Sequence, residues 1–192
     1  GAARYSIDGG NPLEFGVVDT SFHVVGPPLT LAAAQELVFY NLGQEVSGSN
    51  AYAENSSVGT QAASNRRRST SAAGAATTIS LDSLAGLPVG DRAPPYRVIA
   101  VSPPVSYRCD LAAGTLSRHQ DYGFVAAQPD PPKGGTSSVL ATGVTACRFG
   151  VEGTLVAARA AIVNLSLTLS GQTSTDSESV SLQHAIYVSN LP

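Results

Sequence analysis

The sequence predicts a mainly β protein of antiparallel sheets. Two observations carry this prediction: apolar and polar residues alternate in many short segments, and apolar residues almost nowhere recur at helical spacing. The chain has 192 residues, enough for one domain with a hydrophobic core, and we expect a single domain over residues 1–192. Aliphatic side chains should form most of this core, because the chain has no Trp or Met.

Alternation in the N-terminal half predicts strands over residues 13–18 and 36–42. The Ala-rich stretch between them, residues 29–35, has a composition that suits one helical turn. Residues 47–77 are rich in Ser, Ala and Gly, have little to bury and show no period. We expect a long exposed loop there, followed by a short strand over residues 78–81.

Proline marks the next boundary. Residues 96–102 predict a strand that ends at Pro103-Pro104, because proline has no N–H for a sheet ladder. Three short strands should follow as a meander, at residues 105–110, 115–119 and 122–126, with a turn over residues 110–114. A second loop, rich in Pro and Gly, is expected over residues 128–135.

The last two strands have the clearest alternation. Residues 160–170 place aliphatic side chains on one face, and residues 179–191 do the same. The segment between them, residues 171–178, has the composition of a connecting loop. We expect an antiparallel hairpin with one buried face, in which each buried aliphatic side chain contributes roughly 1.5–3 kcal/mol.

Only two cysteines occur, Cys109 and Cys147, and both lie at the same phase of an alternating apolar pattern. We expect them to form a disulfide between strands or sheets. Because a lasting disulfide needs an oxidising compartment, the protein is expected in the periplasm, on the cell surface or outside the cell. A redox or catalytic role is disfavoured, since the two cysteines are far apart in sequence and lie on strands.

Composition also indicates an exported surface protein. Charged residues make up only 13% of the chain, and the net charge of −3 argues against a general nucleic-acid-binding protein. No stretch reaches the ~20 apolar residues that cross a bilayer. We therefore expect a targeting segment or anchor upstream of Gly1, outside these residues.

Sequence motifs for catalysis or cofactor binding are missing: there is no Gly-x-Ser-x-Gly elbow, P-loop or dinucleotide fingerprint. His23, His119 and His184 have no Cys or carboxylate at a metal-ligand spacing, so no metal and no cofactor is expected. His184 is better explained as a hydrogen-bonded, partly buried strand residue than as a ligand. Asp8-Gly9-Gly10, with Glu14 nearby, is better explained as a turn than as a calcium site.

Arg66, Arg67 and Arg68 form the only dense run of charge in the chain. In isolation such a run suggests nuclear targeting or an anionic ligand. Three arginines in a Ser- and Ala-rich loop are more often simply solvated. We therefore treat them as a possible contact loop and as nothing more specific.

A series of short motifs, in this order along nearly the whole chain, resembles the MshO family of minor pilins. These proteins belong to the mannose-sensitive haemagglutinin type IV pilus system and are similar to the J-type pseudopilins of type II secretion. The most specific part is the cysteine strand followed by Gly-Thr-Leu-x-Arg. The motifs are Arg4-Tyr5, Gly10-Asn-Pro-Leu-Glu-Phe15, Asp19-Thr-Ser-Phe22, Val38-Phe-Tyr-Asn-Leu-Gly43, Asn50-Ala-Tyr52, Val105-Ser-Tyr-Arg-Cys-Asp110, Gly114-Thr-Leu-Ser-Arg118, Tyr122-Gly123, Cys147-Arg-Phe149 and the segments 178–184 and 188–192.

The resemblance implies a pilin-like head domain of mostly antiparallel sheet, mounted on a hydrophobic N-terminal helix that these residues lack. That helix would anchor the protein in the inner membrane and later pack within a pilus. The implied role is non-enzymatic, with other minor pilins and the major pilin as partners. The implied location is the cell-surface pilus, after an inner-membrane-anchored periplasmic stage. Residues 47–77 depart from the family in their length and arginine content.

Two alternatives stay open. The head could itself be a tip adhesin that binds a glycan or a surface through Tyr40, Tyr52, Tyr96 or the run of arginines. A secreted hydrolase is the more distant alternative, because it would need paired carboxylates or a nucleophile beside a base, for which the strand phases give no support.

Overall fold

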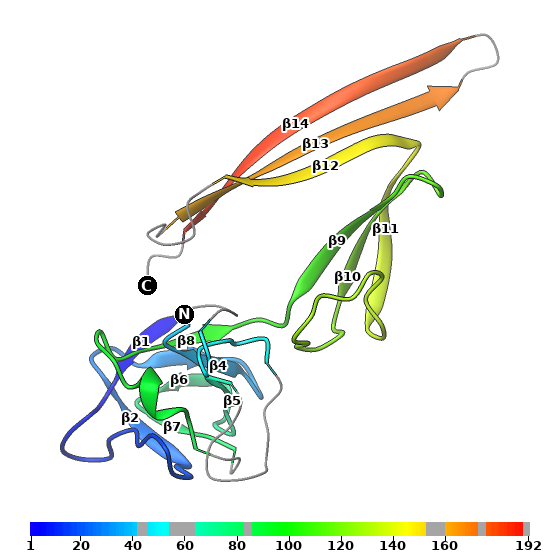
Figure 1. Ribbon diagram of the computed structural model, residues 1–192. Coiled ribbons are helices and arrows are strands. Elements are labelled where there is room, and N and C mark those ends of the chain that lie inside the picture. Colours follow the sequence, from blue (N-terminus) through cyan, green and yellow to red (C-terminus); the bar gives the residue numbers. More distant parts are fainter. Residues whose placement is uncertain (42–45, 54–63, 83–85, 153–159, 173–175, 190–192) are drawn as a thin grey trace. The chain divides into compact units, whose positions relative to one another are not determined.

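The computed structural model describes the chain except for residues 42–45, 54–63, 83–85, 153–159, 173–175 and 190–192 (Figure 1). The described residues form several antiparallel sheets, so the predicted mainly β, antiparallel class is confirmed. Their one helical element is a short 3-10 turn, η1 (Val89–Asp91). None of the helices among the described residues has the length and apolar character needed to span a membrane.

The chain divides into two compact units, whereas its length predicted one domain over residues 1–192. The N-terminal unit comprises residues 1–103 and 124–128. The C-terminal unit comprises residues 104–123 and 129–192. Each unit is described by itself below.

The N-terminal unit is a curled six-stranded sheet that resembles half of a barrel (Figure 1). Its strand order is β5-β4-β8-β1-β2-β7, and every pairing is antiparallel. A separate two-stranded sheet pairs β3 with β6. The strands are β1 (Ala2–Tyr5), β2 (Ser21–Val25), β3 (Leu29–Leu31), β4 (Glu36–Phe39), β5 (Arg66–Arg68), β6 (Gly74–Ala76), β7 (Thr78–Ser80) and β8 (Arg97–Val101).

Aromatic side chains fill the centre of this unit. Tyr5, Phe22 and Phe39 are almost fully buried and meet edge to face, with ring centroids 5.8–6.4 Å apart. Leu37 and Val98, from the paired strands β4 and β8, are also completely buried. The predicted strands over residues 36–42, 78–81 and 96–102 correspond to β4, β7 and β8, which are each shorter than expected.

Residues 13–18, expected as a strand, form a loop. The Asp19 carboxylate accepts hydrogen bonds from the backbone N–H groups of Glu14 (2.8 Å) and Ser21 (3.1 Å), and Gly16 has a φ of 80°. These interactions hold a turn, so only Phe15 makes a sheet-like bridge. Leu13 nevertheless lies in the core, which explains why the segment has an apolar pattern.

Two further expectations for this unit differ from the structure. Residues 29–35 contain β3 and then a turn, closed by the Gln35 side chain accepting from the Ala32 N–H, in place of a helical turn. Residues 47–77 are not one exposed loop, because β5 and β6 lie within them; residues 54–63 of this range lie outside the described residues. These two strands are three residues long each, which is too short for an alternating pattern to reveal them within a Ser-, Ala- and Gly-rich segment.

The C-terminal unit contains two three-stranded antiparallel sheets (Figure 1). The first has the order β11-β10-β9, and the second has the order β12-β13-β14. The last two strands pair through an unbroken register, so the predicted C-terminal hairpin is confirmed. The strands are β9 (Val105–Asp110), β10 (Thr115–Gln120), β11 (Thr136–Thr142), β12 (Val144–Glu152), β13 (Ala160–Gln172) and β14 (Ser177–Ser189).

The predicted meander exists, but its third strand is β11 and not residues 122–126. Asp121 and Gly123 have φ angles of 60° and 81°, and this left-handed backbone ends the ladder after Gln120. The chain pairs with β10 again only at Thr136, beyond the Pro- and Gly-rich loop that the sequence predicted over residues 128–135.

Candidate functional site

The disulfide between Cys109 and Cys147 is present, as predicted, and it links the two sheets of the C-terminal unit. The Cα atoms of the two cysteines are 6.3 Å apart. Around the bond lies a small core of Leu116, Val144 and Leu167. A disulfide in this position is consistent with an oxidising compartment, although it does not decide the location.

The sheet β12-β13-β14 presents a continuous apolar face. Its register places side chains of the same phase in rows across the three strands, because facing residues in an antiparallel sheet point to the same side. One row is Phe149, Leu165 and His184, and the rows on either side contain aliphatic residues. The described apolar residues of this face are Phe149, Val151, Val163, Leu165, Leu167, Leu169, Val180, Leu182 and Ile186. We call this set the apolar face.

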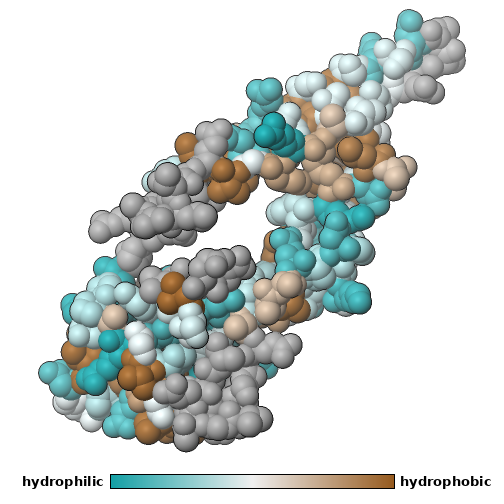
Figure 2. All heavy atoms as spheres, viewed as in Figure 1, coloured by the Kyte–Doolittle hydropathy of each residue, from teal (hydrophilic) through white to brown (hydrophobic). Residues whose placement is uncertain are grey.

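Most of the apolar face is exposed, so the prediction that the hairpin buries one face is wrong. Val180, Leu182 and Ile186 are 56%, 51% and 44% exposed, whereas Leu167 is 6% exposed. The described residues of the small core around the disulfide cover the sheet near Leu167 and, in part, Leu169. Figure 2 shows hydrophobic side chains on the exposed surface of this elongated sheet. Alternation alone indicated which side chains share a face, but not what covers them.

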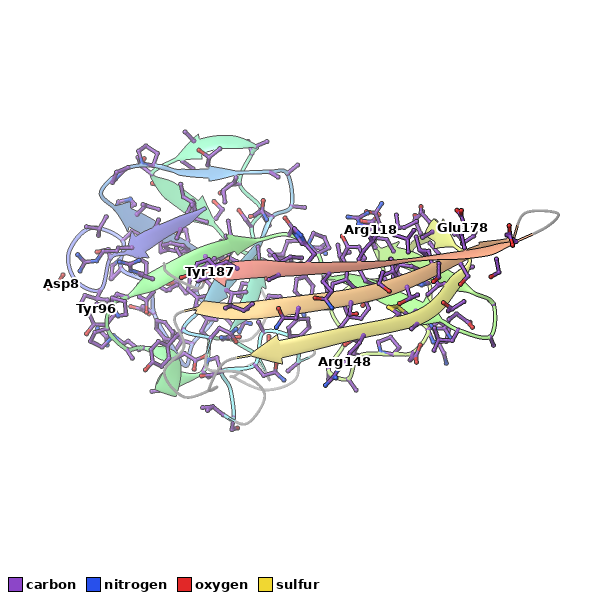
Figure 3. The ribbon with its side chains drawn as sticks, turned by 90° about the horizontal axis from the view of Figure 1, so that it is seen from above. Asp8, Tyr96, Arg118, Arg148, Glu178 and Tyr187 are labelled. Atoms are coloured by element: carbon purple, nitrogen blue, oxygen red, sulfur yellow. A yellow bond between two sulfur atoms is a disulfide. The ribbon has the colours of Figure 1, made fainter. Side chains whose placement is uncertain are left out.

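The opposite face of the same sheet carries a shallow groove of about 670 Å³. Arg148, Ser166 and Gln183 form one row across it, and Asn164 lies in the next row beside Gly150. Gly150 leaves open space there, since a Cβ at this position would meet nothing within 4 Å. Figure 3 shows Arg148 on β12 at one side of the sheet. The lining offers amide, hydroxyl and guanidinium groups for hydrogen bonds.

The run of arginines is not a solvated loop. Arg66 and Arg67 lie on β5 and are only 7% and 2% exposed, while Arg68 is exposed. The Arg66 guanidinium donates hydrogen bonds to the Ala51 carbonyl (2.8 Å) and to the Glu36 carboxylate (3.3 Å). It also lies 4.0 Å from the centroid of the Phe124 ring. These contacts give Arg66 a structural role, so it and Arg67 do not form the contact loop considered above.

Buried acids lie near these arginines. Burial raises the pKa of Asp91 to about 6, although its carboxylate accepts a 2.5 Å hydrogen bond from the Ser49 hydroxyl. Burial also raises the pKa of Asp82 and lowers the pKa of Arg67. Tyr5, in the aromatic core, has its pKa raised to about 12 by burial. Asp91 and Tyr5 are buried and Asp82 is half-buried, and we assign these groups no catalytic role.

No group of three or more His, Cys, Asp or Glu in the described part of the chain could hold a metal ion. His23, His119 and His184 lie on three different strands, β2, β10 and β14. His184 is exposed, so the expectation that it is partly buried is wrong, because nothing described covers this part of the sheet. The buried His119 ring lies 3.1 Å from the Ser117 hydroxyl. Gly9 and Gly10, beside Asp8, have φ angles of 69° and 64°, which are turn conformations.

The tyrosines considered as glycan contacts are not gathered into one site. Tyr52 is half-exposed and its ring meets Phe124, whereas the Tyr96 ring packs against the buried Tyr5. No ring contact within the described ranges joins Tyr40, Tyr52 and Tyr96 to one another. The C-terminal unit offers two candidate binding surfaces instead: the apolar face and the groove on the opposite side of the same sheet.

No protein-family model, curated protein or solved structure matches this chain. The resemblance to the MshO family of minor pilins thus stays a prediction from the quoted motifs.

Proposed function

We propose that this chain is the head of a non-enzymatic minor pilin, which associates with other minor pilins and with the major pilin to initiate or cap a type IV pilus of the mannose-sensitive haemagglutinin kind. The proposed location is the pilus on the cell surface, reached after a periplasmic stage in which an N-terminal helix anchors the protein in the inner membrane. The choice of this type of pilus rests on the motifs that resemble the MshO family of minor pilins.

The exposed apolar face is the observation that supports association most directly. Soluble monomers seldom leave a contiguous apolar surface of this kind in water, and such patches mark interaction sites. Within the described residues the face carries no Asp, Lys or Arg side chain between the row of Val151 and that of Leu169. A partner can therefore cover it without burying an unpaired charge.

The proposal is tested by mixing the purified, disulfide-bonded chain with the heads of the other minor pilins from the same pilus system. Size-exclusion chromatography with light scattering should reveal a mixed complex. Leu182→Asp places a charge on the apolar face at an exposed position and should weaken the complex roughly 10- to 100-fold. A chain that forms no complex with any of these heads would contradict the proposal.

Ser166→Asp is the matched control, because it adds the same charge to the exposed, opposite face of the same sheet. It should leave the affinity nearly unchanged. Equal losses in the two variants would show that the apolar face is not the contact surface.

The groove favours a second candidate function, a tip adhesin that binds a glycan. Sugar hydroxyls pair well with amide and guanidinium groups such as those of Asn164, Gln183 and Arg148. A glycan array is the test. Binding should be lost in Arg148→Ala and kept in Leu182→Asp, and an array without hits would eliminate this candidate.

A further inference from the structure

The two edges of the β12-β13-β14 sheet differ in how well they are protected. The β12 edge has an irregular register between Val144 and Ala146, a glycine at position 150 and the charged Arg148. Bulges and charges of this kind hinder pairing with a further strand. The β14 edge is less protected: it contains no Gly, Pro, Lys or Arg, its one charged side chain, Glu178, lies near one end, and its register with β13 is unbroken over 13 residues.

The β14 edge is also open. Among the described residues β14 pairs only with β13, so the backbone N–H and C=O groups on its outer side lack strand partners (Figure 1). Every side chain from residue 177 to 187 is exposed. A long, unprotected edge presents a template for another β-strand.

We propose that two copies of this chain associate through their β14 edges, which pair antiparallel about a two-fold axis at Gln183. Gln183 is the midpoint of Ser177–Ser189, so only this register pairs the whole strand with its copy. The register also keeps phase: Val180 faces Ile186 of the second copy, and Leu182 faces its His184. The apolar faces of both copies then lie on the same side of one six-stranded sheet.

Charge favours a second copy in this orientation. Glu178 is the only charged residue of β14, and it lies near the end opposite to Tyr187 (Figure 3). Antiparallel pairing puts the two glutamates ten residues apart, about 33 Å along the strand. Parallel pairing would place them side by side, and like charges directly opposite one another destabilise a strand pair. This inference concerns self-association and does not depend on the assignment to the pilins.

Sedimentation equilibrium of the oxidised, full 192-residue chain should reveal a species of twice its 19.6 kDa mass. Gln183→Lys and Gln183→Glu each oppose like charges at the two-fold axis, and each should weaken the dimer about two- to five-fold. An equimolar mixture of the two variants should restore it, because opposite charges then face each other. A chain that stays monomeric at its highest soluble concentration would overturn the proposal.

The register is tested by distances between spin labels. Both native cysteines are in the disulfide, so a cysteine placed on β14 is the only free thiol. Labels on Gln183→Cys should lie side by side in the dimer, and labels on Ser179→Cys should be about 26 Å apart. Short distances at both positions would indicate a parallel pair, and a dimer insensitive to charge at position 183 would indicate face-to-face packing. Either result would overturn the proposal, and circular dichroism of each variant shows that its fold is kept.

Discussion

The Glu36 carboxylate on β4 lies 3.3 Å from the Arg66 guanidinium on β5, and both side chains are about nine-tenths buried. Glu36 thus provides the counter-charge for an arginine inside the N-terminal unit. The same carboxylate also accepts a hydrogen bond from Arg68, whose side chain is 60% exposed. One acid therefore serves one buried and one exposed partner, and the two contacts should differ in their contribution to stability.

Glu36→Gln should lower the free energy of unfolding of the N-terminal unit by about 3–5 kcal/mol, since it leaves the Arg66 charge buried without its counter-charge. Urea unfolding followed by circular dichroism measures the change. Arg68→Gln is the control: it removes the exposed partner and should cost less than about 1 kcal/mol. Similar losses in the two variants would contradict a distinct role for the buried pair.

The pKa of Asp91, raised by burial to about 6 from the usual 3.8, predicts a pH dependence. The Asp91 carboxyl group therefore holds its proton more tightly in the folded state than in the unfolded chain. The stabilisation is therefore complete below pH 3.8 and is lost as the pH rises through 6. Asp91→Asn cannot titrate, so its unfolding free energy relative to the native chain should increase over this range, on the order of 2–3 kcal/mol.

Denaturant unfolding at a series of pH values checks this prediction. Asp110→Asn provides a control of opposite sign, because the Ala113 N–H and the Arg108 guanidinium lower the pKa of Asp110. Its native carboxylate stabilises the fold above the usual pKa, and this advantage is lost as the pH falls. A constant difference between Asp91→Asn and the native chain across pH 3 to 7 would refute the role of burial at Asp91.

The sequence could predict much of the fold because alternation reports directly on strands of sufficient length. The strands β4, β7, β8, β9, β10, β13 and β14 were all expected, and Cys147 was expected on a strand, which is β12. It missed β5 because the stabilising contact of Arg66 is made with Glu36, thirty positions away, and residue type alone suggested a solvated arginine run. Residues 13–18 were misassigned because buried loop residues such as Leu13 also give an apolar pattern.

The candidate site was harder to predict, for a related reason. Phase established that Leu165, Leu167 and Leu182 share one side of the hairpin. Whether that side is covered depends on how far the rest of the unit extends over it, which no local pattern reports. The disulfide was predictable because two lone cysteines on strands leave one intramolecular pairing.

Removing the disulfide should destabilise the C-terminal unit. The bond closes a loop between cysteines 38 positions apart, and loop-closure entropy predicts a contribution of roughly 4 kcal/mol. The double change Cys109→Ser and Cys147→Ser should lower the unfolding free energy of this unit by about that amount. Calorimetry should show that the unfolding transition of the N-terminal unit is unchanged. If the N-terminal unit alone were destabilised, the disulfide would not stabilise the C-terminal unit as proposed.

Leu167 and Leu182 face each other across β13 and β14, and they should respond very differently to the same truncation. Leu167 is 6% exposed beside the disulfide, so Leu167→Ala opens a cavity and should cost about 2–4 kcal/mol. Leu182 is 51% exposed, so Leu182→Ala should cost less than about 1 kcal/mol at low protein concentration. Urea unfolding of the two variants, measured under one set of conditions, gives the comparison. If Leu182→Ala proves as costly as Leu167→Ala in the monomer, something within the same chain covers the apolar face, and that face is not available to partners.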